Sequence, residues 1–459
     1  MVNYRTENPT TGEVEQVFDD LDKAGMDDAI GRAESAYETW RSTSPQDRAA
    51  ILAKVAQLYG ERAEELAAAA TKEMGKPTKE ALGEVQLSAM IYQWYADNGP
   101  GLLADEELPA QGAQRSVVRK EPIGVLLGVM PWNFPYYQVA RFAAPNLMLG
   151  NTILLKHAEI CAASALLMEQ IFTEAGLPKG AYVNVFAPHD VIAQAIADPR
   201  VQGVSLTGSE RAGTAVAKLA GENLKKAVLE LGGSDPFIVL DAADVAGVAK
   251  AAARGRMMNS GQACNSPKRM FVADAIYDQF VDELTAQVEK LTTGDPADAA
   301  TRMGPMSSVT ARDTLAEQVQ DAIDKGATVR TGGKVADGPG AFYPPTVLTD
   351  ITPEMRAWSE ELFGPVAMVY RMTDVDEAIK QANESAYGLS GSVWSDDPEK
   401  AAEVADRLDV GMAYVNEHGT TLPGLPFGGV KNSGFGRELA ADGMGEFVNR
   451  KLIRVAKSK

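Results

Sequence analysis

One short stretch could carry a reactive cysteine. It runs from Asn259 to Asn265 and reads Asn-Ser-Gly-Gln-Ala-Cys-Asn. Asn, Ser and Gly favour turn conformations, so the stretch predicts a tight loop with Cys264 beside a backbone N–H group. A cysteine in such a loop can act as a nucleophile, because local donors stabilise its thiolate. The alternative is a small buried apolar residue, which is what most free cysteines are.

A carboxylate and an amide elsewhere in the chain could serve the same reaction. Glu230 lies in the apolar run 228–231, where burial should raise its pKa and suit it to general-base work. Asn133 lies between Pro131 and Pro135, which fix the backbone so that the amide can donate to a developing oxyanion. The alternatives are a glutamate held by a buried partner and an ordinary turn asparagine.

Two predicted strand ends have features of a nucleotide site. The segment 208–213, Gly-Ser-Glu-Arg-Ala-Gly, follows a strand ending at Thr207 and opens a helix, whose N-terminal N–H groups suit phosphates. It lacks the Lys-Ser/Thr of a P-loop, and no predicted strand is followed by G-x-G-x-x-G. Lys156 ends another strand three residues before Glu159, and the two could hold a ribose. A plain strand-to-helix turn and a solvent-exposed lysine are the alternatives.

Other cysteine or metal chemistry finds no support in the sequence. A phosphatase-type C-x5-R loop would need arginine at position 270, where the chain has Met270. The three histidines, His157, His189 and His418, lack the spacing of metal ligands, so we expect no metal site. Nothing marks one of them as a partner of Cys264, which leaves a papain-like site unsupported.

The elements that must position these residues alternate between short buried strands and helices. This alternation is typical of a parallel α/β sheet, whose ligands bind at the carboxyl ends of the strands. The N-terminal part predicts helices over 26–40, 45–74 and 78–98. Strands are then expected over 151–156, 181–186 and 203–207, with helices over 162–175, 189–197 and 210–220. After Gly232-Gly233 the pattern repeats, with helices over 243–258, 275–291 and 308–325 and strands over 268–273, 366–370, 391–394 and 412–415.

Length and composition narrow the class of protein. The 459 residues suggest two or three domain-sized units. The net charge of −19 argues against binding nucleic acid or an anionic membrane surface. Two cysteines exclude a disulfide framework and favour the reducing cytoplasm. The N-terminal residues lack the apolar core of a signal peptide, and prolines and polar residues interrupt the apolar region 123–155, so we expect neither secretion nor a membrane span.

Seven segments together resemble the aldehyde dehydrogenase superfamily over nearly the whole chain. Each is weak alone, but all occur in the order typical of that superfamily. They are Pro131-Trp-Asn-Phe-Pro135, Lys156-His-Ala-Glu159, Leu206-Thr-Gly-Ser209, Leu229-Glu-Leu-Gly-Gly233, Gly261-Gln-Ala-Cys264, Glu360-Glu-Leu-Phe-Gly-Pro365 and Pro426-Phe-Gly-Gly429. Within the superfamily, residues 125–132 and 231–237 look most like bacterial succinate-semialdehyde dehydrogenases.

The resemblance implies an α/β architecture, namely the aldehyde dehydrogenase fold with a Rossmann-like cofactor domain, an α/β catalytic domain and a small β oligomerisation element. The NAD(P)-binding domain would comprise 1–110 and 122–231, and the catalytic domain 232–430. Residues 111–121 and 431–459 would form the oligomerisation element and C-terminal tail of a homodimer or a dimer of dimers.

The resemblance also implies a reaction and the residues that perform it. Cys264 would attack an aldehyde, Asn133 and the backbone N–H of Cys264 would hold the oxyanion, and Glu230 would activate water to hydrolyse the thioester. Because Glu159 would accept from a free 2′-hydroxyl and repel a 2′-phosphate, NAD is weakly favoured over NADP. The cofactor, NAD or NADP, would contact Trp132, Lys156, Glu159, Gly208, Ser209, Leu231, Glu361 and Phe363.

The implied substrate is a short aldehyde with a carboxylate at its far end, succinic semialdehyde first. Arg141 would grip that carboxylate, with Tyr137 one helical turn before it and Thr421 as a further hydroxyl donor. A helix-surface arginine in a salt bridge is the alternative for Arg141. The rival functions are oxidation of another short aldehyde, such as glutarate semialdehyde or an aminoaldehyde, and non-catalytic cofactor binding on the same scaffold.

Overall fold

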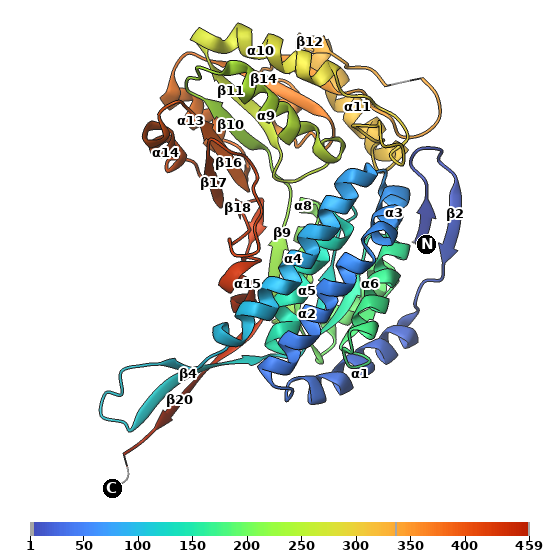
Figure 1. Cartoon of the computed structure of the whole chain (residues 1–459), viewed down its shortest axis with the longest axis vertical. Helices are drawn as coiled ribbons and strands as arrows, with labels where there is room; N and C mark the ends of the chain where they lie inside the picture. Colours follow the sequence, from blue (N-terminus) through green and yellow to red (C-terminus); the bar gives the residue numbers. More distant parts are fainter. Residues whose placement is uncertain (1–3, 336, 458–459) are drawn as a thin grey trace.

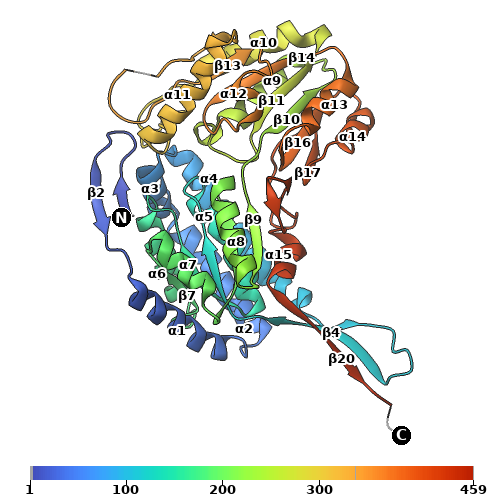
Figure 2. The same ribbon diagram turned by 180° about the vertical axis from the view of Figure 1, so that it is seen from behind.

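Two mostly parallel sheets, each covered by helices on both faces, form the body of the molecule. The computed structural model describes residues 4–335 and 337–457. Figures 1 and 2 show the two sheets as a lower and an upper body, with a long two-stranded arm leaving the lower one. The α/β architecture of mostly parallel sheets expected from the sequence is therefore what the chain adopts.

The first sheet has the strand order β19-β9-β8-β5-β6-β7. Its edge strand β19 pairs antiparallel with β9, and the other neighbours pair in parallel. The strands are short, rich in Val and Leu and almost fully buried, as strands covered on both faces should be. Their bounds are β5 Val125–Val129, β6 Thr152–Lys156, β7 Tyr182–Asn184, β8 Val201–Thr207, β9 Lys226–Glu230 and β19 Gly434–Phe435.

Two layers of helices sandwich this sheet. On one face, Ile30 of α1, Val191 of α7 and Val216 of α8 share an apolar core with Leu127 and Leu154 of the strands. The helices α2 to α6 share a larger core with the other face. The bounds are α1 Lys23–Trp40, α2 Pro45–Glu61, α3 Ala63–Met74, α4 Thr78–Leu102, α5 Pro135–Leu149, α6 Ala162–Glu174, α7 His189–Ala197 and α8 Glu210–Glu222.

The second sheet has the order β12-β13-β14-β11-β10-β16-β17, and β12 pairs antiparallel with β13. Helices α9 and α10 cover one face, and α11 to α14 cover the other. The strands are β10 Asp235–Val239, β11 Pro267–Ala273, β12 Thr328–Thr331, β13 Thr346–Thr349, β14 Val366–Met372, β16 Ser390–Trp394 and β17 Met412–Val415. The helices are α9 Val245–Met257, α10 Asp274–Glu289, α11 Val309–Asp324, α12 Arg356–Ser359, α13 Val375–Asn383 and α14 Pro398–Ala405.

The arm is a small antiparallel sheet of order β20-β4-β3. Strands β4 and β20 pair along their full length, from Arg115 with Val455 to Pro122 with Val448. The arm and the minor elements are β3 Glu106–Glu107, β4 Arg115–Pro122, β20 Val448–Val455, the pair β1 Tyr4–Glu7 and β2 Val14–Phe18, the pair β15 Tyr387–Gly388 and β18 Val430–Lys431, and helix α15 Ala440–Glu446.

The strands and helices predicted from the alternating pattern are confirmed to within a few residues, but the single helix expected over 45–74 is wrong. It is two helices that meet at Arg62, whose backbone (φ −106°, ψ 22°) leaves the helical region. The Arg62 side chain binds Glu65 and Glu174, which fixes the break. The apolar spacing continues through the break, so periodicity alone could not detect it.

The chain crosses from the first sheet to the second between Glu230, the last residue of β9, and Asp235, the first of β10. The carboxyl ends of the first sheet's strands therefore face the amino ends of β10 and β11. The loop that carries Cys264 immediately precedes β11, so it lies at this junction. Residues that are distant in sequence converge here.

Candidate active site

The loop that carries Cys264 has an unusual backbone. After α9, a short 3-10 turn, Met258–Gly261, places Asn259 and Ser260 at φ 54° and 53°. This is a left-handed backbone conformation that residues other than glycine rarely adopt. Hydrogen bonds hold it: Asn259 N–H donates to Glu80 Oε2 at 2.8 Å, and Ser260 Oγ donates to the Gly304 carbonyl at 2.9 Å. The turn chemistry read from the sequence thus produces a tight, fully anchored loop.

Asn133 reaches this loop from the start of α5. Its Nδ2 donates to the Gln262 carbonyl at 3.1 Å, and its own carbonyl accepts from Asn259 Nδ2 at 2.8 Å. The amide is buried, and Cys264 beside it is half-buried. The predicted oxyanion donor and the predicted nucleophile therefore lie on segments that are hydrogen-bonded to each other.

A cavity of about 280 Å³ lies at the junction of the two sheets. Eight of the residues predicted from the sequence line it, and they come from both sheets. They are Trp132, Asn133, Gly208, Ser209, Leu231, Cys264, Glu361 and Phe363, with Pro131, Gln138, Thr207 and Gly232 completing the wall. The structure thus brings the predicted nucleophile together with most of the predicted cofactor residues.

The cavity fits a nicotinamide dinucleotide at several points. A Cβ on Gly232 would lie 2.5 Å from Glu361 Oε2, so glycine leaves this part of the wall open beside a carboxylate that can accept from ribose hydroxyls. The rings of Trp132 and Phe363 meet edge-on, with centroids 5.8 Å apart, and offer flat apolar surface. The N-terminus of α8, capped by Ser209, presents N–H groups suited to phosphate.

Glu230 is 2% exposed, and neither carboxylate oxygen has a hydrogen-bond partner among the described residues. Burial raises its pKa well above the ordinary value, and the nearby Arg141 cation opposes the rise. A buried, unpartnered carboxylate of this kind is suited to take a proton from water. The alternative expected from the sequence was a glutamate held by a buried partner, but within the described residues no group forms a hydrogen bond with the Glu230 carboxylate.

Burial also raises the pKa of the Cys264 thiol, to about 11, while the cations of Arg141 and Lys268 lower it. The resting thiol is therefore largely neutral near pH 7. The other cysteine, Cys161, is fully buried at the start of α6, and burial raises the pKa of its thiol well above the ordinary value. Cys264 is the thiol placed for chemistry.

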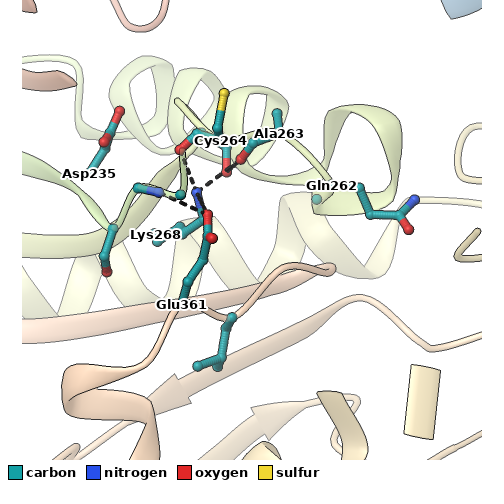
Figure 3. Close-up of polar contacts among 12 residues, drawn as sticks. Asp235, Gln262, Ala263, Cys264, Lys268 and Glu361 are labelled. Carbon is teal, nitrogen blue, oxygen red and sulfur yellow. Dashed lines mark hydrogen bonds and ion pairs between the residues drawn. The ribbon is translucent and has the colours of Figure 1, made fainter. Parts of the chain in front are cut away.

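Lys268, at the start of β11, belongs to the site and was not predicted from the sequence. Its ammonium is buried and donates to the carbonyls of Cys264 and Ala263 at 2.7 and 2.9 Å. It also pairs with Glu361, with Nζ 3.1 Å from Oε1 (Figure 3). Gly233 N–H donates to the same Glu361 oxygen at 3.1 Å. Only its place four residues after the cysteine pointed to it in the sequence.

Arg141 lies within a buried cluster on α5. Its Nη1 donates to the Tyr137 hydroxyl at 3.2 Å, and its guanidinium lies 4.1 Å from the Phe427 ring centroid. Burial raises the pKa of Tyr137, and Arg141 and the contacting Thr421 hydroxyl oppose the rise. The three predicted substrate residues are therefore together, but Arg141 is fully buried and ion-paired with Glu438, which was not predicted.

Lys156 and Glu159 form an ion pair after β6, with Nζ 2.5 Å from Oε1, and neither lines the 280 Å³ cavity. The lysine pairing holds the pKa of the Glu159 carboxyl below its ordinary value despite the burial that raises it. No group of His, Cys, Asp and Glu within residues 4–335 and 337–457 could hold a metal ion. No helix in those ranges is both long enough and apolar enough to cross a membrane.

Comparison with known proteins identifies the family. The model of the aldehyde dehydrogenase family matches residues 2–453. A Deinococcus radiodurans protein named succinate-semialdehyde dehydrogenase (NADP(+)) is 55% identical, over 99% of this chain and 95% of its own length. A Mycobacterium avium protein of the same name is 45% identical, over 99% and 97%. The crystal structure of succinic semialdehyde dehydrogenase from Streptococcus pyogenes in complex with NADP+ matches with a TM-score of 0.97 at 42% identity, covering 99% of this chain and all of that one. The chain belongs to the aldehyde dehydrogenase family.

Proposed function

We propose that this chain oxidises succinic semialdehyde to succinate with NAD or NADP as the cofactor. The observation that carries the proposal is the shared cavity of Cys264, Asn133 and Glu361 at the sheet junction, with the unpartnered carboxylate of Glu230 buried at the end of the adjacent strand β9. The names of the Deinococcus and Mycobacterium relatives support this choice of substrate.

In this reaction the Cys264 thiolate attacks the aldehyde carbon and forms the oxyanion of a thiohemiacetal. Asn133 and the backbone N–H of Cys264 hold the oxyanion, which is the charge that develops in the transition state. A bound nicotinamide cofactor supplies the hydride acceptor, and Cys264 is left as a thioester. Glu230 then takes a proton from water, the water oxygen attacks the thioester carbon, and the Cys264 thiolate leaves as the acid forms.

The cofactor would lie along the carboxyl edge of the first sheet. Glu361 would accept from the nicotinamide ribose, and Lys156 with Glu159 would face the adenosine ribose. Glu159 favours NAD, because a carboxylate accepts from a 2′-hydroxyl and repels a 2′-phosphate. Its pairing with Lys156 reduces that repulsion, and the relatives are named for NADP(+), so we infer that both cofactors are used.

Arg141 would recognise the far carboxylate of the substrate, assisted by the hydroxyls of Tyr137 and Thr421. A guanidinium binds a carboxylate with charge-assisted hydrogen bonds and would repel the ammonium of an aminoaldehyde. Because Glu438 already pairs with Arg141, the substrate carboxylate and Glu438 would both bind the Arg141 guanidinium.

We also propose that the chain forms a homodimer or a dimer of dimers through the arm. Strands β4 and β20 project from the body and expose Leu452 and Val455. The division into a cofactor domain (1–110 and 122–231), a catalytic domain (232–430) and an oligomerisation element (111–121 and 431–459) remains part of this proposal. The chain's passage between sheets at 231–234 supports the first boundary.

The test is reduced-nicotinamide absorbance after purified protein is mixed with succinic semialdehyde and either NAD or NADP, beside propanal as a neutral aldehyde. We expect much faster turnover with succinic semialdehyde than with propanal. Equal rates would remove the carboxylate-recognition role of Arg141. No turnover by folded protein with a titratable Cys264 thiol would exclude succinic semialdehyde as the substrate.

A further inference from the structure

Lys268 is a buried cation in the middle of the site, and nothing in the proposed reaction uses it. Its side chain is 0% exposed and has three partners: the carbonyls of Ala263 and Cys264 and the carboxylate of Glu361. Removing an ammonium from water is unfavourable unless its donors find partners in the protein. Here the two carbonyls and the carboxylate together provide partners for the ammonium, which offsets the cost of burying it.

The contact with the Ala263 carbonyl has a direct consequence for the oxyanion donor. The Ala263 carbonyl and the Cys264 N–H belong to one peptide unit, which is planar and trans, so that C=O and N–H point in opposite directions. The bond from Lys268 Nζ at 2.9 Å therefore fixes the direction of the Cys264 N–H. Ser266 Oγ donates to the same carbonyl at 3.2 Å and reinforces this orientation.

The contact with Glu361 connects that peptide to the cofactor side of the cavity. Glu361 Oε1 accepts from Lys268 and from Gly233 N–H, each at 3.1 Å. A Cβ on Gly233 would lie 2.5 Å from the Cys264 carbonyl, so this glycine lets the two segments pack closely. Figure 3 shows the ammonium lying between the loop carbonyls and the Glu361 carboxylate. Lys268 therefore links the Glu361 carboxylate directly to the carbonyls of the nucleophile loop.

We propose that Lys268 is a positioning residue, which aims the Cys264 backbone N–H at the oxyanion and couples it to cofactor binding at Glu361. The coupling to Glu361 rests on the proposed function, whereas the orientation of the peptide does not. Lys268 itself touches neither aldehyde nor cofactor in this scheme. It acts through the peptide plane and through the Glu361 carboxylate.

Arg269 provides a matched control. Adjacent residues of a strand point to opposite faces, and Arg269 is also a buried cation that binds three carbonyls, those of Ser234, Gln381 and Ala382, at 2.8, 3.1 and 3.0 Å. None of these carbonyls belongs to the Cys264 loop. Arg269→Gln should therefore reproduce the loss of stability caused by Lys268→Gln without its effect on chemistry.

The first measurement needs no aldehyde. The rate of Cys264 alkylation by iodoacetamide is followed against pH in the wild type, Lys268→Gln, Lys268→Arg and Arg269→Gln. Loss of the cation should raise the thiol pKa in Lys268→Gln, which lowers the rate at pH 8 about tenfold for a shift of one unit. Lys268→Arg should recover most of the rate, and Arg269→Gln should match the wild type.

The second measurement separates orientation from folding. With succinic semialdehyde, Lys268→Gln should lower kcat about tenfold to a hundredfold, somewhat less than the loss of an oxyanion donor, with a smaller change in the KM for NADP. The effects of Lys268→Gln and Glu361→Gln on kcat should be non-additive, because each variant breaks the same link. The melting temperatures of all variants show how much of each effect comes from a loss of stability.

Several results would overturn the proposal: an unchanged alkylation profile and kcat in folded Lys268→Gln, additive effects with Glu361→Gln, or losses in Arg269→Gln equal to those in Lys268→Gln. If Lys268→Gln does not fold, Lys268→Arg provides the test. Its guanidinium keeps the charge but places the N–H donors differently, so kcat should fall by a larger factor than the KM for NADP changes. If the wild type oxidises propanal but not succinic semialdehyde, the proposed substrate is wrong, and the same comparison of kcat with propanal decides the positioning role.

Discussion

Arg141 Nε lies 2.6 Å from Glu438 Oε2, and both side chains are buried. The pair joins α5 to the segment just before α15, so the far C-terminal part of the chain completes the surroundings of the active site. The same cation opposes the rise in the pKa of Glu230. One guanidinium therefore influences two buried carboxylates and, in the proposed function, the substrate carboxylate as well.

Arg141→Gln should selectively impair the anionic substrate. Loss of a charge-assisted contact of about 1.5–3 kcal/mol predicts a fall in kcat/KM for succinic semialdehyde of roughly 10- to 150-fold. Because propanal has no carboxylate, its kcat/KM should rise relative to that of succinic semialdehyde. Glu438→Gln is the control, since it removes the ion pair but keeps the guanidinium. Equal losses for both aldehydes in Arg141→Gln would contradict carboxylate recognition.

Glu230→Gln should stop the second half of the reaction while leaving the first. Without the buried base, the thioester on Cys264 should persist, so a rapid burst of about one reduced cofactor per active site should precede a turnover slowed by about 10²–10⁴. Rapid mixing detects the burst, and mass spectrometry detects the acylated protein. Since burial raises the pKa of this base well above its ordinary value, wild-type deacylation should accelerate as the pH rises. A variant that turns over at the wild-type rate would remove Glu230 from the mechanism.

The thiol of Cys264 should titrate late in the absence of cofactor. With a pKa of about 11, its thiolate fraction rises about tenfold per pH unit between pH 7 and 9, and alkylation by iodoacetamide should follow. Cys264→Ser should show no alkylation, because Cys161 is fully buried. A plateau in the wild-type rate below pH 8 would show that the folded protein stabilises the thiolate far more than the charges around it indicate.

Asn133→Ala should lower kcat by about 10²–10³, the range found when one oxyanion donor is removed. The KM for the aldehyde should change little, because the donor acts on charge that develops in the transition state. The Asn133 side chain also donates to the Gln262 carbonyl, so the melting temperature must be followed in parallel. A fall in kcat smaller than threefold in a folded variant would show that the backbone N–H suffices.

Glu159→Ser tests the cofactor preference. Removing the carboxylate beside Lys156 should raise kcat/KM for NADP and lower it for NAD, because the lysine becomes free to meet a 2′-phosphate. Steady-state kinetics with both cofactors at fixed aldehyde provide the comparison. The role assigned to Glu159 is wrong if the ratio of the two kcat/KM values stays within twofold of the wild type.

Residue type and local pattern were enough to predict Cys264, Glu230 and Asn133 as candidates, because each chemistry requires a recognisable local setting. A cysteine in a turn, a carboxylate in an apolar strand and an amide between prolines are all visible over a few residues. The parallel α/β pattern was visible for the same reason, since buried strands and amphipathic helices differ in period.

Lys268 and Glu438 were not predicted from the sequence, because their roles depend on partners contributed by other elements. Lys268 acquires its function from the carbonyls of the preceding loop and from Glu361 on a distant segment. Glu438 matters only because folding places it against Arg141, and a single sequence carries no signal of that pairing. The break at Arg62 was hidden for a similar reason, since its partner Glu174 lies on another helix.

The antiparallel pairing of β19 with β9, which sets Gly434 opposite Glu230, bears on how the protein is made. The strand β9, which ends in Glu230, is synthesised about 200 residues before its outer neighbour β19. Until those later residues have been made and have folded, β9 has an open edge and Arg141 lacks its partner Glu438. In the proposed function, the active site is therefore complete only once these later residues have folded against β9 and α5.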